Sequence, residues 1–144
     1  MTRIDFYSLK EPTRGDRFLL ACRLVERIYG TGQRTFIQVP DRELARHLDR
    51  LLWTFRQQSF LPHGLANDSD RALTPILIGY GDDPGEENQV LINLSLEVPP
   101  FLERFERLCE LIDQDSNVRE AGRKRYVYYR DQGYPLHHHK IRLY

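Results

Sequence analysis

Basic and aromatic residues recur at helical spacing near the end of the chain and suggest a site for an anion. They stand at i, i+4, i+7 and i+11, at Arg119, Arg123, Tyr126 and Arg130, which is one face of a helix. Guanidinium groups bind carboxylates through paired hydrogen bonds, and a ring among them can accept an apolar side chain. The pattern fits an acidic peptide with a hydrophobic end. Single-stranded nucleic acid could also bind there, through phosphate contacts and stacking, and a solvated cationic face is the ordinary alternative.

The charge distribution favours such a local site. The chain has 21 basic and 21 acidic residues and no net charge. Residues 117–144 nevertheless hold seven Lys and Arg residues against two acidic ones. This asymmetry predicts that an anionic partner is attracted to one region rather than to the whole surface.

No motif for nucleotide binding is present. The chain has neither a GxGxxG fingerprint nor a GxxxxGK[ST] loop. Gly79 and Gly81 follow a β-rich run, but the four carboxylates within residues 82–87 would repel a polyphosphate. We interpret these carboxylates as a solvated hairpin turn, because they lack the spacing of a calcium loop.

Motifs for metal binding and nucleophilic catalysis are missing too. Residues 137–139 are consecutive histidines, which rarely converge on one ion in extended chain, so we interpret them as a solvated tail. His47 and His63 have no Cys or Asp partner at motif spacing, and there is no GxSxG or HExxH. We therefore expect no cofactor, no metal ion and no catalytic residue.

The elements that must position the basic stripe alternate between strands and helices. Residue patterns predict strands near 4–9, 35–39, 76–80 and 90–94, and helices near 16–30, 41–55, 100–112 and 116–132. This order implies an α/β fold with a largely parallel sheet and helices on both faces. We expect one domain over residues 1–144, because single cores usually span about 100–150 residues.

The cysteines and the apolar runs indicate the cellular compartment in which we expect the protein. Cys22 and Cys109 fall on the apolar faces of two predicted helices, which favours buried free thiols and a reducing cytoplasm. The longest apolar run, residues 18–22, is too short to span a bilayer, and no apolar signal core follows the N-terminus. We expect a cytoplasmic protein.

Residues 54–74 lack clear periodicity but contain several apolar side chains. Loops of this length are usually functional. Phe60 is flanked by Ser59 and Pro62 and is poorly placed for an ordinary core position, so we predict that it forms an exposed patch with Trp53. The alternative is that these rings fold back onto the core.

Five stretches together resemble one family, the chi subunit of bacterial DNA polymerase III holoenzyme. They are residues 4–7, 52–53, 59–63, 123–130 and 133–136. The most specific parts are the Trp followed by Ser-Phe-Leu-Pro-His and the block Arg-Lys-Arg-Tyr-Val-Tyr-Tyr-Arg. The resemblance covers essentially the whole chain.

The resemblance implies a Rossmann-like α/β domain without a nucleotide-binding loop, acting in DNA replication as a non-catalytic adaptor. Members of the family bind the acidic, Phe-terminated C-terminal tail of single-stranded DNA-binding protein, and so reach DNA indirectly. The corresponding contacts are Arg119, Arg123 and Tyr126, with Arg130 in the same block. Val127 stands where the family often has a lysine, and Lys124 or Arg130 could compensate.

The resemblance also implies a second interface. The psi subunit, which ties chi to the clamp loader, is the expected partner there, and a helicase can compete for the same surface. The positions that correspond to this interface are Trp53, Phe60, Pro62 and His63.

Overall fold

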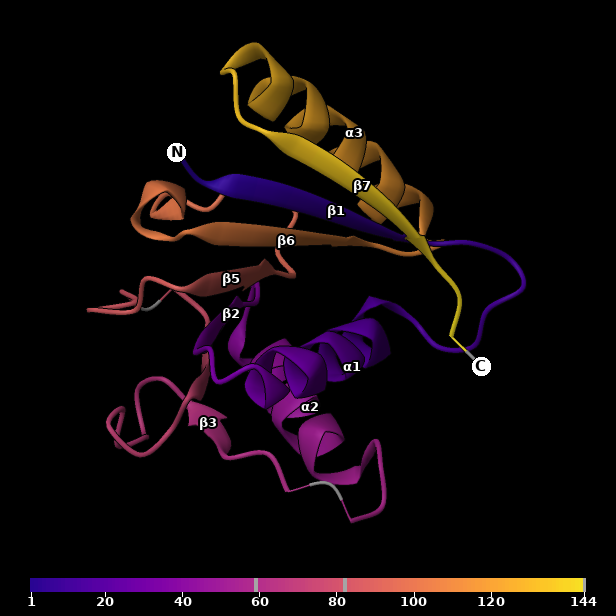
Figure 1. Cartoon of the computed structure of the whole chain (residues 1–144). Helices are drawn as coiled ribbons and strands as arrows, with labels where there is room; N and C mark the ends of the chain where they lie inside the picture. The colour runs from indigo at the N-terminus through magenta and orange to yellow at the C-terminus, as the bar shows by residue number, and fades with distance from the viewer. Residues whose placement is uncertain (59, 82, 144) are drawn as a thin grey trace.

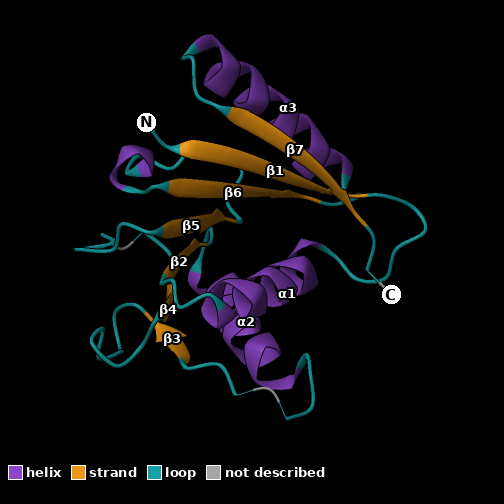
Figure 2. Cartoon of the chain, viewed as in Figure 1, coloured by secondary structure: helices purple, strands orange, loops and turns teal. Residues whose placement is uncertain are grey.

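The computed structural model describes residues 1–58, 60–81 and 83–143. Within these residues, seven strands form one sheet in the order β3-β4-β2-β5-β6-β1-β7, and every pairing is parallel (Figures 1 and 2). The strands are β1 (Arg3–Leu9), β2 (Thr35–Gln38), β3 (His63–Leu65), β4 (Ile76–Gly79), β5 (Val90–Asn93), β6 (Arg107–Ile112) and β7 (Leu136–Ile141). The helices are α1 (Arg17–Gly30), α2 (Arg42–Thr54) and α3 (Ser116–Asp131), with a 3-10 turn η1 (Leu102–Arg104).

The helices cover both faces of the sheet, as expected (Figure 1). α1 and α2 lie on one face, where residues such as Val25 and Leu48 pack on Ile92 and other strand residues. α3 and η1 lie on the other face, over a second core that includes Leu108 and Tyr129. Side chains of successive strand residues enter the two cores alternately, which is the arrangement of a three-layer α/β fold.

Local signals fix where the helices begin. The carboxylate of Asp16 accepts hydrogen bonds from the N–H groups of Phe18 and Leu19 at the start of α1. Asp41 caps α2 in the same way, as predicted, by accepting from the N–H of Leu44 at 2.9 Å. These bonds satisfy N–H groups that have no partner within the helix.

The helix predicted over residues 100–112 is wrong. The segment forms η1 and then β6, which lies between β1 and β5. A strand covered on both faces is apolar on both sides, and Leu108 enters one core while Cys109 and Leu111 enter the other. Apolar residues from the turn and the strand together imitated a helical period. Both cysteines are free and buried as expected, although Cys109 lies on a strand.

Two further expectations about connections are wrong. Residues 137–139 are not a solvated tail but part of β7, an edge strand parallel to β1. The acidic segment after β4 does not make a hairpin, because β2 lies between β4 and β5. Asp82, in that segment, lies outside the described residues. Over the described chain, no helix combines the length and apolar character needed to cross a membrane.

Candidate functional site

The predicted helix over residues 116–132 is confirmed as α3, and its position is set by close packing on the sheet. Asp115 caps the helix by accepting from the N–H groups of Asn117 and Val118. A Cβ atom at Gly122 would lie 2.5 Å from Cδ1 of Ile112, a distance that real contacts do not reach. The glycine therefore lets the backbone of α3 approach β6 closely.

A buried ionic network beneath α3 holds the rotation of the helix. Arg125 is 4% exposed, and its Nε and Nη2 donate to the carboxylate of Glu110 at 3.0 and 3.1 Å. The hydroxyl of Tyr129 donates to the same carboxylate at 2.5 Å. Burial, reinforced by the charge of Glu110, raises the pKa of Tyr129, so this hydroxyl keeps its proton. Val118, Gly122, Arg125 and Tyr129 are buried on the inner side of α3, so the other residues of the helix face outward or sideways.

One flank of α3 borders a cavity of about 500 Å³ at the carboxyl ends of β1 and β6. The apolar part of its lining includes Phe6, Leu9 and Ile112, and the cationic part is Lys10, Arg119, Arg123 and Lys140. Tyr126 lies between these two parts of the lining, and its ring packs edge-to-face against Phe6 at a centroid distance of 5.3 Å. We call this cavity and its lining the α3 site.

The described lining of the α3 site has a net positive charge, with four cationic and two acidic side chains. Arg119 and Arg123 are exposed, and among the described residues neither has an ion-pair partner within 4.0 Å. Asp113 also lines the cavity, but its Oδ2 accepts from the backbone N–H of Arg17 at 3.0 Å and lies 3.7 Å from the guanidinium of Arg17. Glu11 is the other acidic residue of the described lining. The site can therefore pair with carboxylates or phosphates through guanidinium groups that are not already occupied.

The structure brings three of the four stripe residues together. Arg119, Arg123 and Tyr126 line the α3 site, whereas Arg130 is absent from the described lining and pairs with Asp131 at 3.3 Å. Two further lining residues, Lys10 and Lys140, were not predicted. Lys140 follows residues 137–139, which were interpreted as a tail, and Lys10 lies more than 100 residues before α3 in the sequence. Recognition of a strand in residues 136–141 would have placed Lys140 on the same face as His138, which also lines the cavity.

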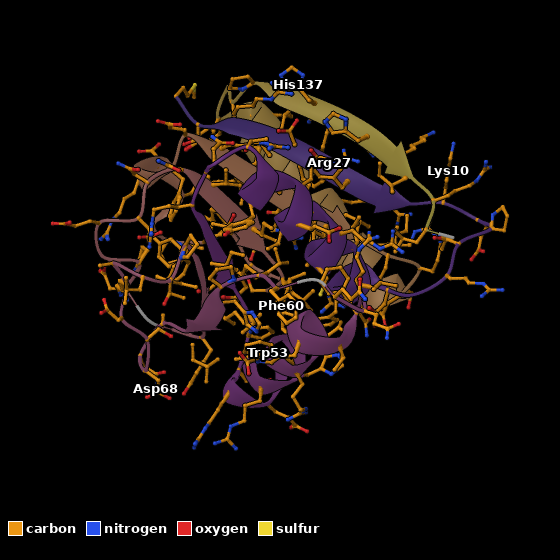
Figure 3. All side chains as sticks on the ribbon, turned by 60° about the horizontal axis from the view of Figure 1, so that its bottom comes forward. Lys10, Arg27, Trp53, Phe60, Asp68 and His137 are labelled. Atoms are coloured by element: carbon orange, nitrogen blue, oxygen red, sulfur yellow. The ribbon has the colours of Figure 1, made fainter. Side chains whose placement is uncertain are left out.

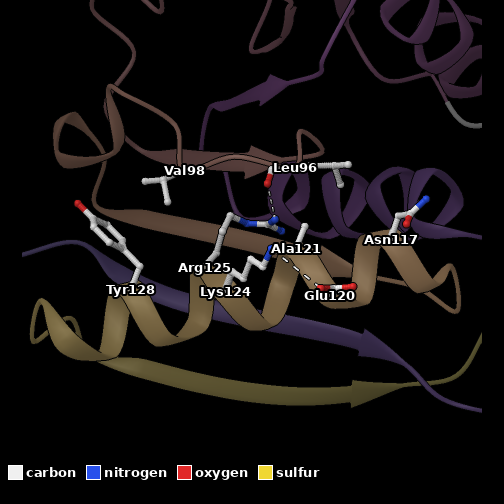
Figure 4. Close-up of a pocket in the computed structure, with 8 residues that line it drawn as sticks. All are labelled: Leu96, Val98, Asn117, Glu120, Ala121, Lys124, Arg125 and Tyr128. Carbon is white, nitrogen blue, oxygen red and sulfur yellow. Dashed lines mark hydrogen bonds and ion pairs between the residues drawn. The ribbon is translucent and has the colours of Figure 1, made fainter.

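The other flank of α3 borders a separate cavity of about 530 Å³ (Figure 4). Lys124 lines this cavity with Tyr128 and pairs with Glu120 at 4.0 Å. Arg125 closes its base by donating to the carbonyl of Leu96 at 3.0 Å. Lys124 therefore lies on the flank of α3 opposite to Arg123.

The second group of predicted site residues is only partly on the surface. Trp53 is 58% exposed and Phe60 is 82% exposed, Pro62 is exposed too, and Figure 3 shows the two rings on the same side of the molecule. The prediction that Trp53 and Phe60 are exposed is confirmed, and we call these two rings the Trp53–Phe60 patch. Ser59 lies outside the described residues.

His63 lies under this patch rather than in it. Its side chain is fully buried, and the ring of Trp53 packs on it at a centroid distance of 4.6 Å. Its Nδ1 is 2.6 Å from the carbonyl oxygen of Leu61, and its Nε2 is 3.2 Å from the carbonyl oxygen of Asp49. His63 therefore joins the segment after α2 to the helix itself and supports Trp53 from below.

Comparison with known proteins gives a consistent result. The family model described as "DNA polymerase III chi subunit, HolC" matches residues 1–137. A Pseudomonas aeruginosa protein named DNA polymerase III subunit chi is 38% identical over 141 residues, which are 98% of each chain. Proteins of the same name from Haemophilus influenzae and Escherichia coli are 30% and 27% identical, over 92% and 94% of this chain and 92% and 96% of theirs.

A solved structure shares the fold alone. The crystal structure of T4 UvsW superposes with a TM-score of 0.70 at 8% sequence identity. The match covers 99% of this chain but 42% of the T4 protein. At this sequence identity the match supports a shared architecture and no conclusion about the site.

Proposed function

The chain belongs to the DNA polymerase III chi subunit family, and we propose that within the replication machinery it acts as a non-catalytic adaptor. Its α3 site would bind the acidic, Phe-terminated C-terminal tail of single-stranded DNA-binding protein. Its Trp53–Phe60 patch would bind psi, and through psi the clamp loader, or a competing helicase. The adaptor would thereby connect the replicase to protein-coated single-stranded DNA.

One observation supports the tail assignment above the others: among the described residues Arg119 and Arg123 have no ion-pair partner, and they line a cavity that also has an apolar part and Tyr126. A surface that served only solubility would usually pair such arginines with neighbouring acids at i,i+4. Here the two arginines can hold carboxylates while the cavity accepts a terminal aromatic ring. A charged peptide with an apolar end requires both features in one place.

The geometry also suggests how the peptide would lie. The C-terminal carboxylate and nearby acidic side chains would pair with Arg123 and Arg119, and the Phe ring would enter between Tyr126 and Ile112. Val127 is 43% exposed and brings no charge, so Lys10 and Lys140 of the described lining would supply the further cationic contacts. Lys10 directly follows β1 and Lys140 belongs to β7, so neither lysine comes from α3.

The Trp53–Phe60 patch supports the second interface by its exposure. Large rings that stay on the surface of a small domain are typical anchors of partner interfaces. Phe60 is the more exposed of the two, and Trp53 is supported by the buried His63 ring. The patch therefore combines a projecting side chain with a rigid one.

Exchange of Arg123 for glutamate tests the tail assignment. Arg123→Glu removes a charge-assisted pair and adds repulsion, so we expect about 10–100-fold weaker binding of a Phe-terminated acidic peptide by calorimetry. Lys124→Glu is the matched control, because it makes the same change of charge at the next residue but on the opposite flank of α3. Equal affinities of Arg123→Glu and wild type would refute the assignment.

A direct single-stranded nucleic-acid interface along α3 is the alternative function. It is favoured by the exposure of Tyr126 and Tyr128, at 37% and 46%, because exposed rings can stack on bases. A fluorescent oligonucleotide titrated into the same variants separates the two functions. Tight oligonucleotide binding that Arg123→Glu abolishes, together with no peptide binding, would favour this alternative.

A further inference from the structure

A second cluster of basic side chains lines a cavity of about 280 Å³ on the α1 side of the sheet. Four arginines from three separate parts of the chain meet there: Arg23 and Arg27 of α1, Arg56 after α2, and Arg142 after β7. We call these residues the α1 arginine cluster. The remaining lining is largely apolar and includes Leu24 of α1.

The charge of this cluster is not balanced locally. Arg23 and Arg27 are exposed and one helical turn apart, an arrangement of like charges that destabilises a helix slightly. Glu26 is the acidic residue of the described lining, and it pairs with Arg56 at 3.0 Å. Arg142 donates through Nε to a backbone carbonyl, that of Glu11, at 3.2 Å. The described part of the cavity therefore presents a positive surface over an apolar base.

The cluster is continuous with the α3 site around the end of β7. Lys140 lines the α3 site, whereas the next two residues, Ile141 and Arg142, line the cavity of the cluster. Lys140 and Ile141 are successive strand residues, which point to opposite faces of the sheet, and Arg142 follows the end of the strand. The backbone N–H of Lys10 donates to the carbonyl of Ile141 at 2.9 Å, so Lys10 is held at the same junction. Figure 3 shows Arg27 and Lys10 on either side of the end of β7.

We propose that the α1 arginine cluster binds acidic side chains of the same peptide that ends in the α3 site, at positions further from its Phe end. This inference rests on the proposed function and extends it from one cavity to a path over the β7 edge. The arginines would pair with carboxylates, and aliphatic side chains of the peptide would rest on the apolar base.

The described lining favours a peptide over a nucleic acid. Single strands bind proteins by stacking bases on exposed rings beside the cationic groups. The aromatic residue of this lining is Tyr7, which is 7% exposed and whose ring stacks on His139 at 4.6 Å. The described lining has no exposed ring on which a base could stack. Its arginines can pair with carboxylates, and its apolar residues can contact aliphatic groups.

The path between the two sites sets the length of the peptide needed. Crossing from one face of a sheet to the other is a distance on the order of 20 Å, because packed layers lie about 10 Å apart. An extended chain covers that distance in about six residues. A four-residue peptide ending in Phe should therefore reach only the α3 site, whereas a twelve-residue acidic peptide should reach both.

Calorimetry with three synthetic peptides tests the inference on the full chain. The probes are a four-residue peptide ending in Asp-Phe, a twelve-residue acidic peptide with the same end, and that longer peptide with its upstream acids changed to serine. The double variant Arg23→Glu/Arg27→Glu should bind the long acidic peptide about tenfold more weakly and the other two unchanged, since an exposed ion pair contributes about two- to fivefold. Arg42→Glu/Arg46→Glu is the matched control, because it places the same change at i,i+4 on α2, outside both described linings.

The outcomes separate this inference from the proposed function. If the short peptide binds wild type but the long acidic peptide gains nothing over it, or loses nothing in the double variant, the inference is overturned and the proposed function stands. If the short peptide does not bind wild type, the proposed function fails. A single-stranded oligonucleotide whose binding is lost in the double variant while peptide affinities stay unchanged would assign the cluster to nucleic acid and overturn the inference. Melting temperatures of both double variants confirm that the fold is retained.

Discussion

Arg123 and Arg125 stand two residues apart on α3 and have opposite surroundings. Arg125 is 4% exposed and bound to Glu110 through two hydrogen bonds, whereas Arg123 is exposed at the α3 site. The difference follows from the helical period, which turns a side chain by about 200° over two residues. One arginine therefore stabilises the fold, and the other remains available for a ligand.

Tyr126 is predicted to contribute to peptide binding through packing rather than charge. Tyr126→Ala removes the ring that packs on Phe6 and borders the cavity, so we expect weaker binding with little change in its salt dependence. Calorimetry at low and high salt measures both quantities. The slope against salt should stay close to that of wild type for Tyr126→Ala and should fall for Arg123→Glu. A fall of equal size in both variants would contradict the packing role.

Phe60 is predicted to be an interface anchor whose removal leaves the fold intact. It is 82% exposed, so Phe60→Ala should leave the melting temperature nearly unchanged while costing about 2 kcal/mol or more in psi or helicase binding. The neighbouring Leu61 is 5% exposed, and Leu61→Ala should instead destabilise the fold by about 2–5 kcal/mol. Thermal melts and pull-down affinities of the two variants give the comparison. Strong destabilisation by Phe60→Ala with unchanged partner affinity would refute the anchor.

At the scale of elements, the strands β1, β6 and β7 share a buried carboxylate. Asp5 of β1 is fully buried and accepts hydrogen bonds from Arg107 of β6 at 2.8 Å and from Arg3 at 3.1 Å. Nε2 of His139 of β7 lies 2.9 Å from its Oδ1. These contacts join the edge strand to the interior of the sheet, and thereby hold the position of Lys140, the next residue of β7.

The same carboxylate predicts a loss of stability in acid. Burial by itself would raise the pKa of Asp5, but the hydrogen bonds of His139, Arg107 and Arg3 outweigh burial and hold the pKa below its ordinary value of 3.8. An acid whose pKa is lowered by folding contributes stability that is present above its unfolded pKa and disappears as the pH falls through its folded pKa. We therefore expect the contribution of Asp5 to be lost below about pH 4.

Urea unfolding at pH 6 and pH 3 measures this contribution. Asp5→Asn should lower the free energy of unfolding at pH 6 and reduce the further loss between pH 6 and pH 3. Asp68→Asn is the control, since Asp68 is an exposed carboxylate. An identical acid profile of wild type and Asp5→Asn would show that the carboxylate does not have this role.

At the scale of the whole molecule, the two proposed interfaces lie toward opposite edges of the sheet. The Trp53–Phe60 patch is formed by the end of α2 and the segment before β3, which is one edge strand, whereas the α3 site includes residues of β7, which is the other. The two partners could therefore bind together, as an adaptor requires. Peptide binding in Phe60→Ala should accordingly match that of wild type.

The thiols report on the integrity of the whole fold. Burial raises the pKa of Cys22 and of Cys109 to about 12, so neither forms an appreciable thiolate near neutral pH. We expect iodoacetamide to modify both residues only through opening of the core, at rates that rise together with denaturant. Mass spectrometry of the alkylated protein measures these rates. Rapid labelling of either cysteine without denaturant would contradict the packing described for α1 and β6.

The sequence alone determined those features that depend on neighbouring residues. Asp41 and its helix, the bounds of α3 to within one residue, and the clustering of Arg119, Arg123 and Tyr126 all follow from local periodicity and capping chemistry. The exposure of Phe60 also followed from its unpatterned surroundings.

Only the tertiary structure decided which distant segments meet. β1 pairs with β6 and with β7, more than 100 residues further along the chain, and local periodicity does not encode such pairings. For this reason β6 resembled a helix, residues 137–139 resembled a tail, and Lys140 was not assigned to the α3 site. The same limit applies to Arg125, whose partner Glu110 lies on a different element. A parallel sheet is built from contacts between segments far apart in sequence. The residues that form a site on such a sheet can therefore be identified only from the tertiary structure, which brings those segments together.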